Sequence, residues 1–126
     1  MLLSSIPSTM GAPAQEAPAR RYLLNNCFIA GFQNHEGPAV LRELKVGTPL
    51  ALVRDVKNIF DRYAIRLEYQ GRHVGFIPRE QNRTVAELLE QGAPISCSIT
   101  EVDRDAKLWE AVRIEVSIPV AEPPAS

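Results

Sequence analysis

Residues 50–69, with the sequence LALVRDVKNIFDRYAIRLEY, are the stretch that most strongly indicates the fold. Apolar side chains alternate with polar ones at Leu50 and Leu52, and again from Ile65 to Tyr69. Alternation of this kind is typical of half-buried β-strands. Because a polar stretch, residues 55–62, separates the two runs, the segment predicts a strand, a loop and a second strand.

The loop places two apolar residues, Ile59 and Phe60, among charged and amide side chains. An aromatic ring displayed beside hydrogen-bond donors and acceptors can stack on a flat ligand and hold the ligand's polar edge. The same ring could instead fold back as a plug over the end of a barrel. The sequence leaves both interpretations open.

Four further strands are expected, at residues 21–32, 72–77, 95–102 and 108–120. Within the first of them, Gly31 marks a bend or a place where another backbone comes close. Alternation in the fourth strand of the chain, residues 72–77, puts Val74 and Phe76 on one face. Residues 38–44 could form one helical turn.

One helix is expected at residues 82–91. Thr84 and Glu87 have the spacing of a capping box, and an apolar stripe follows at Val85, Leu88 and Leu89. Together these elements predict a mainly β fold, a small six-stranded OB-like or SH3-like barrel with one helix between strands four and five.

Length and charge restrict the function. The chain has 126 residues, enough for one domain, and 14 Lys plus Arg against 15 Asp plus Glu give a net charge of -1. No overall attraction to nucleic acid or to an anionic membrane follows, so any such binding needs a local patch. Because no nucleophile elbow, phosphate-binding glycine loop or metal-ligand triad appears, we expect a non-catalytic protein without a metal or other cofactor.

The two cysteines, Cys27 and Cys97, lie far apart in the sequence and have no Cys or His neighbour at zinc-finger spacing. A disulfide between them would need neighbouring strands and an oxidising compartment. We therefore expect buried free thiols.

The ends of the chain differ in composition from its middle. Residues 1–20 are rich in Ser, Ala and Pro, and we expect them and the tail at 121–126 to be disordered around one domain at 21–120. The segment could be the remnant of a signal peptide that begins upstream, which would make the protein periplasmic, but it lacks a basic start. As written, the sequence predicts a cytoplasmic protein with no run long enough to span a membrane.

Basic residues concentrate in the middle third of the chain, where a barrel could bring them onto one face. Phosphate oxygens bind such donors, so the group favours a nucleic-acid interface. Alternatively these are solvated charges balanced by nearby acids. The residues are Arg54, Lys57, Arg62, Arg72, Arg79 and Arg83.

Three blocks of the sequence resemble the signature blocks of a HIRAN domain. The first joins FIAG at residues 28–31 to QNHEG at 33–37, the second is LVRDVKNIFDRYAI at 52–65, and the third is VGFIPRE at 74–80. The resemblance implies an OB-like barrel that binds single-stranded DNA, with a pocket for the free 3′ end in the best-understood eukaryotic members. Such modules stand at the N-terminus of some SWI/SNF-type ATPases and also occur alone in bacteria.

The resemblance also implies roles for the loop. Phe60 corresponds to an aromatic residue that stacks on a terminal base, and Asp61 to an aspartate that contacts the 3′-hydroxyl. The chain departs from the eukaryotic pattern at Asn34 and His35, where an aromatic pair is usual, and at Ile59 and Tyr63, where Pro and Asn are usual.

The sequence therefore predicts a binding module for single-stranded DNA or exposed 3′ DNA ends, with any remodelling left to an ATPase or nuclease partner. An alternative is a protein-interaction module, exported or cytoplasmic, that keeps the fold and has lost the DNA pocket. The residues expected to bind nucleic acid are Asn34, His35, Lys57, Asn58, Phe60, Asp61, Arg62, Phe76 and Arg79.

Overall fold

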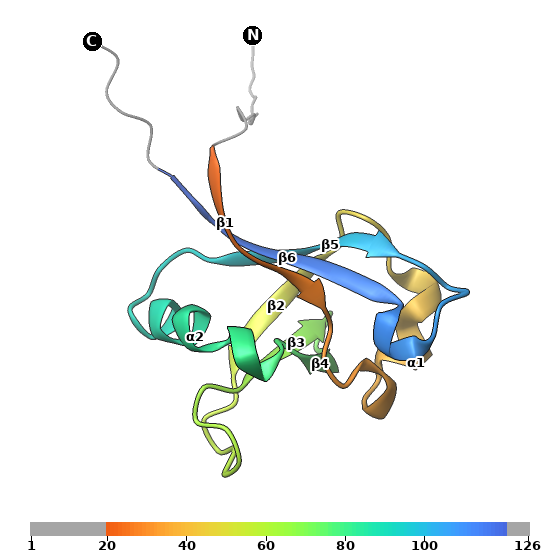
Figure 1. Ribbon diagram of the computed structural model, residues 1–126, viewed down its shortest axis with the longest axis horizontal. Helices are drawn as coiled ribbons and strands as arrows, with labels where there is room; N and C mark the ends of the chain where they lie inside the picture. Colours follow the sequence, from red (N-terminus) through yellow and green to blue (C-terminus); the bar gives the residue numbers. More distant parts are fainter. Residues whose placement is uncertain (1–19, 121–126) are drawn as a thin grey trace, which may run out of the picture.

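The computed structural model describes residues 20–120 and contains one antiparallel sheet of six strands (Figure 1). The expectations for most of residues 1–20 and for 121–126 lie outside this range. The strand order is β1-β6-β5-β2-β3-β4, so the expected mainly β class is confirmed. The strands are β1 (Arg21–Phe28), β2 (Pro49–Arg54), β3 (Ile65–Tyr69), β4 (Arg72–Phe76), β5 (Ser96–Val102) and β6 (Val112–Pro119).

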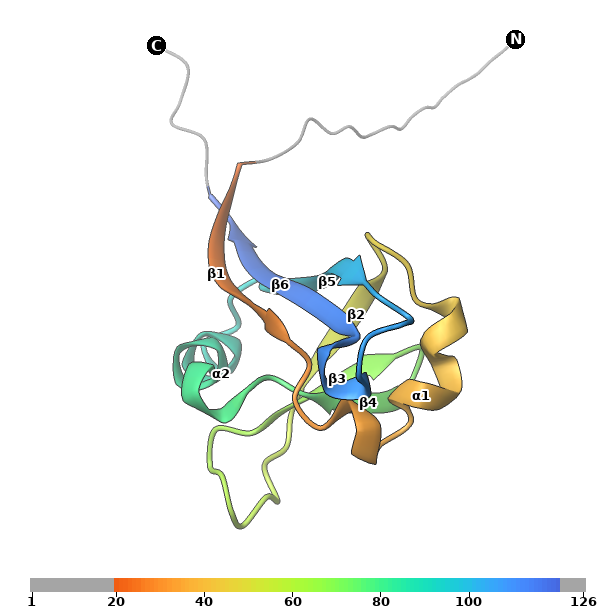
Figure 2. The same ribbon diagram turned by 45° about the vertical axis from the view of Figure 1, so that its right-hand side comes forward.

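The sheet folds over on itself, so that β1, β6 and β5 form one layer and β2, β3 and β4 cross beneath it (Figure 1, Figure 2). Its two edges meet just beyond the end of β1. There Ala30 and Phe76 exchange two backbone hydrogen bonds, N to O, of 2.9 and 2.8 Å. This single bridge, rather than a continuous ladder, joins the edges, so the OB-like sheet is not a fully closed barrel.

The core lies between the two layers. Its members come from every strand and from the first turns of the helices, and burial of this apolar surface is the main term that stabilises the fold. The largest side chains that are fully buried are Phe32, Ile29, Leu44, Ile65, Leu67, Ile77, Ile99 and Ile114.

Several predicted boundaries were wrong because helical turns replace the ends of predicted strands. β1 stops at Phe28, and Gly31, with φ of 71°, forms the expected bend into a short 3₁₀ turn, η2 (Phe32–Asn34). The start of the predicted last strand is another such turn, η5 (Leu108–Glu110). Residues 38–44 make more than one turn, divided between α1 (Gly37–Val40) and η3 (Leu41–Glu43).

The predicted helix exists as α2 (Arg83–Glu90), preceded by the 3₁₀ turn η4 (Arg79–Gln81). The capping-box prediction was wrong, because the N-cap position belongs to Asn82 and not to Thr84. The amide of Asn82 makes no capping hydrogen bond. It reaches instead to the loop between β2 and β3, as described below.

An irregularity in β4 breaks the predicted alternation. Gly75 has φ of 148°, and the β3–β4 register shifts beside it. Val74 and Ile77 therefore both point into the core, while Phe76 is only half-buried. A Cβ atom on Gly75 would come within 2.4 Å of Ile29 Cγ2 and 2.6 Å of the Ala30 carbonyl oxygen, so only glycine allows the two edges to approach.

Replacement of this glycine by alanine is expected to destabilise the protein severely. Gly75→Ala adds steric overlap to an unfavourable φ, and we expect it to lower the free energy of unfolding by about 3 kcal/mol or more. Gly92→Ala is the matched control, since Gly92 also has a positive φ, 79°, but nothing lies within 4 Å of its added Cβ. Its cost should be about 1–2 kcal/mol. Urea denaturation measures the free energy of unfolding of both variants. Equal losses would contradict the close approach of Ile29 and the Ala30 carbonyl to Gly75.

Both cysteines are free and buried, as expected. Cys27 pairs with Ile114 of β6, whereas Cys97 pairs with Val116 and with Leu50. Burial raises the pKa of Cys27 to about 11 and that of Cys97 to about 12. The two cysteines therefore form no disulfide with each other.

These thiols should be almost inert in the folded protein, because only the thiolate is nucleophilic. We expect negligible labelling by a disulfide reagent at pH 7.5 in buffer, and labelling of both thiols in denaturant. Rapid labelling of either cysteine without denaturant would contradict the buried, protonated state.

No helix within residues 20–120 has the length and apolar character needed to cross a membrane.

Candidate functional site

The loop from Asp55 to Ala64 projects from the β2–β3 end of the sheet, beside α2 (Figure 2). At its base, the Asp55 N–H donates to the Ala64 carbonyl over 2.9 Å. At its tip, the Asn58 side-chain oxygen accepts from the N–H groups of Phe60 (2.9 Å) and Asp61 (3.1 Å). Asn58 is therefore a turn residue that shapes the loop from within.

The tip of the loop presents apolar side chains to solvent. Phe60 is 77% exposed and Ile59 87% exposed, so the ring is not a plug over the end of the sheet. The Phe60 carbonyl accepts a hydrogen bond of 3.0 Å from Arg79 Nη2 in η4. Because the backbone that carries the ring is anchored, little conformational entropy is lost when the ring stacks on a ligand.

The carboxylate of Asp61 already has two protein partners. Its Oδ1 accepts from the Tyr63 N–H over 2.9 Å, and its Oδ2 accepts from Asn82 Nδ2 over 2.8 Å. Asn82 is 2% exposed, so this second bond ties the loop to the start of α2. Each carboxylate oxygen has a second lone pair, so Asp61 can still accept from a ligand hydroxyl.

Three rings gather where the edges of the sheet meet. His35, which follows η2, stacks on His73 of β4 with ring centroids 4.0 Å apart. Phe76 packs edge-on against both, at 5.4 Å from His35 and 4.8 Å from His73. His35 is thus the outer member of a three-ring cluster, and Phe76 belongs to that cluster more than to the core.

A pocket of about 210 Å³ lies between the loop and the Ala30–Phe76 bridge. Four predicted site residues from three segments line it, namely Asn58, Asp61, Phe76 and Arg79. The rest of its wall is apolar, from Ala30, Ala64 and Ile77. An apolar pocket with a few convergent polar groups is typical of a small-ligand site. We call it the end pocket.

The other five predicted residues do not line this pocket. Phe60 and Arg62 line a second, larger hollow on the α2 side of the loop, which shares Asp61 and Arg79 with the end pocket. Asn34, His35 and Lys57 are exposed and line neither space. Six of the nine predicted residues therefore line two adjoining spaces, and the other three lie outside both.

The predicted basic patch is only partly free. Arg54 donates to the carbonyls of Ala64 and Arg62, each over 2.8 Å, and pairs with Glu90 at 2.8 Å, so it is a structural brace. Arg72 pairs with Glu36 at 2.8 Å. Within residues 20–120, Lys57, Arg62 and Arg79 form no ion pair.

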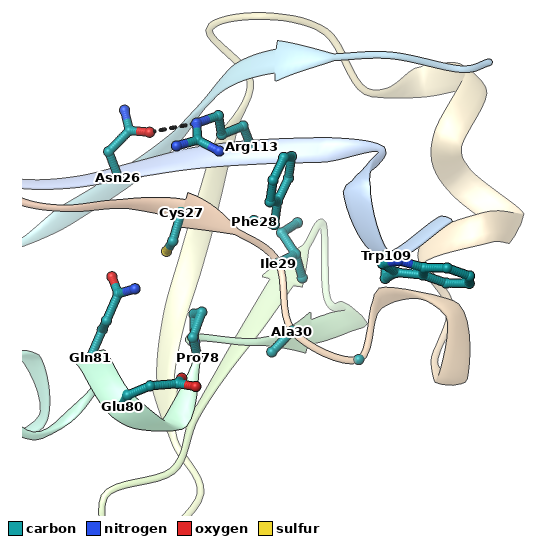
Figure 3. A pocket seen from close by; sticks show the side chains of 11 residues that line it. Asn26, Cys27, Phe28, Ile29, Ala30, Pro78, Glu80, Gln81, Trp109 and Arg113 are labelled. Atoms are coloured by element: carbon teal, nitrogen blue, oxygen red, sulfur yellow. Dashed lines mark hydrogen bonds between the residues drawn. The ribbon is translucent and has the colours of Figure 1, made fainter. Parts of the chain in front are cut away.

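A further hollow of about 470 Å³ lies between the end of β1, η4 and the start of β6. Figure 3 shows the side chains that line it. The Arg113 guanidinium lies over the Phe28 ring at 4.7 Å, and its Nε donates to Asn26 Oδ1 over 2.8 Å. Trp109, the one tryptophan of the chain, is 52% exposed at its rim. Ala30 lines both this hollow and the end pocket.

Sequence reasoning missed four residues of this region. Tyr63 was noted only as a departure from a family pattern, Asn82 only as a helix start, and His73 and Trp109 only as parts of predicted strands. Asn82 stands where a capping side chain is expected, but it makes no capping hydrogen bond, so that signal does not reveal its contact with Asp61. No local signal could pair His73 with His35, because their stacking depends on how the sheet edges meet.

Within residues 20–120, no three His, Cys, Asp or Glu side chains gather as metal ligands.

The HIRAN domain family model matches residues 23–121. The chain belongs to the HIRAN domain family. HIRAN domains are in general DNA-binding modules and typically non-catalytic. No curated protein matches the chain.

Two solved structures are similar to this HIRAN domain. One is a protein from Lactobacillus plantarum, with 25% identity and a TM-score of 0.66, covering 79% of this chain and 95% of that one. The other is the HIRAN domain of human HLTF, with 17% identity and a TM-score of 0.61, covering 78% of each chain. The latter likeness concerns the fold alone.

The histidine cluster should make stability depend on pH. Burial, His35 and Arg66 together lower the pKa of His73 below its ordinary value, although the Gly75 carbonyl and Glu68 oppose them. Because the unfolded chain then binds the proton more readily than the folded one, stability should fall as pH falls below about 6.5. We expect His73→Gln to lose less in melting temperature than the parent between pH 7.5 and 5.5. Equal losses would show that His73 does not contribute.

Proposed function

We propose that this HIRAN domain binds the exposed end of single-stranded DNA, with the terminal 3′ nucleoside at the end pocket. The observation that carries the proposal is an exposed ring, Phe60, held beside a pocket with a carboxylate and a guanidinium at its edge. DNA binding is general in the family, whereas the preference for a single-stranded 3′ end is our proposal.

Each side chain has a role that its chemistry supports. Phe60 offers a free π-face, which any base can stack on. Asp61, held by Tyr63 and Asn82, would accept a hydrogen bond from a 3′-hydroxyl through a remaining lone pair. Arg79, with one Nη bound to the Phe60 carbonyl, keeps further N–H groups for a phosphate.

The remaining predicted residues would support this grip. Asn58 shapes the loop, and Phe76 forms the apolar wall of the end pocket. Lys57, Arg62, Asn34 and His35 flank the site as exposed groups that a strand can contact on its way out. We propose no catalytic residue, so any remodelling activity would come from an ATPase or nuclease partner.

Loss of the ring should weaken binding. Stacking on an aromatic side chain contributes about 1–3 kcal/mol per base, so Phe60→Ala should reduce affinity for a single-stranded 10-mer about 5- to 150-fold. Fluorescence anisotropy with a 5′-labelled oligonucleotide measures this. Val56→Ala is the matched control, since Val56 is 76% exposed in the same loop and lines neither the end pocket nor the larger hollow. Equal affinities for Phe60→Ala and Val56→Ala would refute the stacking role.

The end of the strand should matter as well. An oligonucleotide with a 3′-phosphate cannot donate a 3′-hydroxyl proton and brings negative charge toward Asp61, so the parent should prefer the 3′-hydroxyl form. Asp61→Asn should reduce this preference, because the repulsion is removed. Circular dichroism must first establish that the variant folds. If the parent does not distinguish the two ends, 3′-end recognition is wrong.

A parent that binds no oligonucleotide at low salt would favour the alternative, a protein-interaction module with this fold.

A further inference from the structure

A hollow of about 580 Å³ lies between the loop and the start of α2, and it shares Asp61 and Arg79 with the end pocket. Three arginines from different segments line it: Arg62 of the loop, Arg79 of η4 and Arg83 of α2. The lining contains one carboxylate, Asp61, whose two oxygens already accept hydrogen bonds. In a chain with a net charge of -1, this is a local concentration of positive charge.

The Tyr63 ring organises two of these cations. The Arg62 guanidinium lies 5.2 Å from the ring centroid and the Arg83 guanidinium 5.3 Å from it. Cation–π contacts of this length restrain a long side chain without using its N–H donors. The donors therefore remain for a ligand, and the planar fork of an arginine suits the two oxygens of a phosphate.

One ion pair competes with such a ligand. Arg83 Nε pairs with Glu87 Oε2 at 3.2 Å, one turn along α2. The two side chains are 71% and 47% exposed, and exposed pairs of this kind are weak. Glu87 does not line the hollow, so Arg83 can exchange this partner for a phosphate without leaving a buried charge.

We propose that the Arg62–Tyr63–Arg83 face is a second nucleic-acid subsite, which holds backbone phosphates beyond the terminal nucleotide. The proposal rests on the proposed function, because it needs a strand whose end lies at the neighbouring end pocket. The two spaces share Asp61 and Arg79, so a strand that ends in one passes directly to the other. The phosphates come either from the same strand or from the complementary strand of a tailed duplex.

The subsite distinguishes probes by length and strandedness. Three probes are needed: a 3′-hydroxyl trinucleotide used as a competitor, a single-stranded 12-mer, and a duplex with a three-nucleotide 3′ tail. Arg83→Ala should bind the trinucleotide as the parent does, because this probe has its 3′ end at the end pocket and is too short to place phosphates on Arg83. It should bind at least one longer probe about 5-fold or more weakly, with the salt slope reduced by about 0.7–0.9 per phosphate lost.

Three further variants complete the test. Tyr63→Ala should weaken the same probe, because it frees both guanidinium groups, and Arg83→Lys should retain part of the affinity. Arg42→Ala, which removes an exposed arginine of η3 outside the hollow, should behave as the parent.

The pattern of loss for Arg83→Ala identifies the source of the phosphates. A loss of affinity for the 12-mer alone assigns the phosphates to the bound strand, and a larger loss for the tailed duplex assigns them to the complementary strand.

The outcomes separate the two proposals. If Phe60→Ala weakens binding while Arg83→Ala and Tyr63→Ala bind every probe like the parent, the subsite is wrong and the end pocket remains. If Arg83→Ala weakens the trinucleotide as much as the longer probes, Arg83 acts at the terminal nucleotide, which also overturns the subsite. If the parent binds no probe, both proposals fall.

Discussion

Two backbone hydrogen bonds between Ala30 and Phe76 hold the edges of the sheet together, and the functional region depends on them. They form because Gly75 has no side chain where Ile29 and the Ala30 carbonyl approach. The bridge brings the segment after β1 against β4, which stacks His35 on His73 and places Phe76 edge-on to both rings. It also supplies the floor of the end pocket, since Ala30 and Phe76 both line that space.

A second constraint fixes the loop relative to this floor. Asn82, Arg54 and Arg79 reach the loop from α2, β2 and η4, and each donates to an oxygen atom in it. Together with the turn that Asn58 forms, these hydrogen bonds give partners to backbone groups of the loop and to the Asp61 carboxylate. The Phe60 ring stays exposed to solvent. The loop is therefore preorganised, which lowers the entropy that a ligand must overcome on binding.

Much of the fold could be predicted from side-chain alternation, and the failures have physical causes. β3 keeps a strict period of two, and β5 follows it at Cys97 and Ile99, because one face of each strand packs on the core. In β2 the alternation is clear only around Leu50. Alternation fails at Gly75, where a register shift changes which face is buried. It also fails at Leu108, where residues with the composition of a strand form a 3₁₀ turn instead.

The candidate site divides in the same way. Residues close together in sequence, such as Asn58, Phe60 and Asp61, could be grouped from the loop alone, and the structure brings Asp61 to Arg79 and Phe76 as well. Arg54 looked like part of a basic surface, but its guanidinium is used by two carbonyls and Glu90. The role of Asn82 depends on a contact across 21 positions, which no local pattern encodes.

The hydrogen bonds that brace the loop determine which of its positions can be substituted without loss of the fold. Because the supports act on Asp61 and on backbone carbonyls, the outward side chains at Val56, Lys57 and Ile59 carry no structural duty in the described part of the chain. Selection or an engineer could vary Lys57 and Ile59 to alter ligand preference while the scaffold stays intact. The tip is thus a variable recognition surface on a braced scaffold, comparable to a grafted recognition loop.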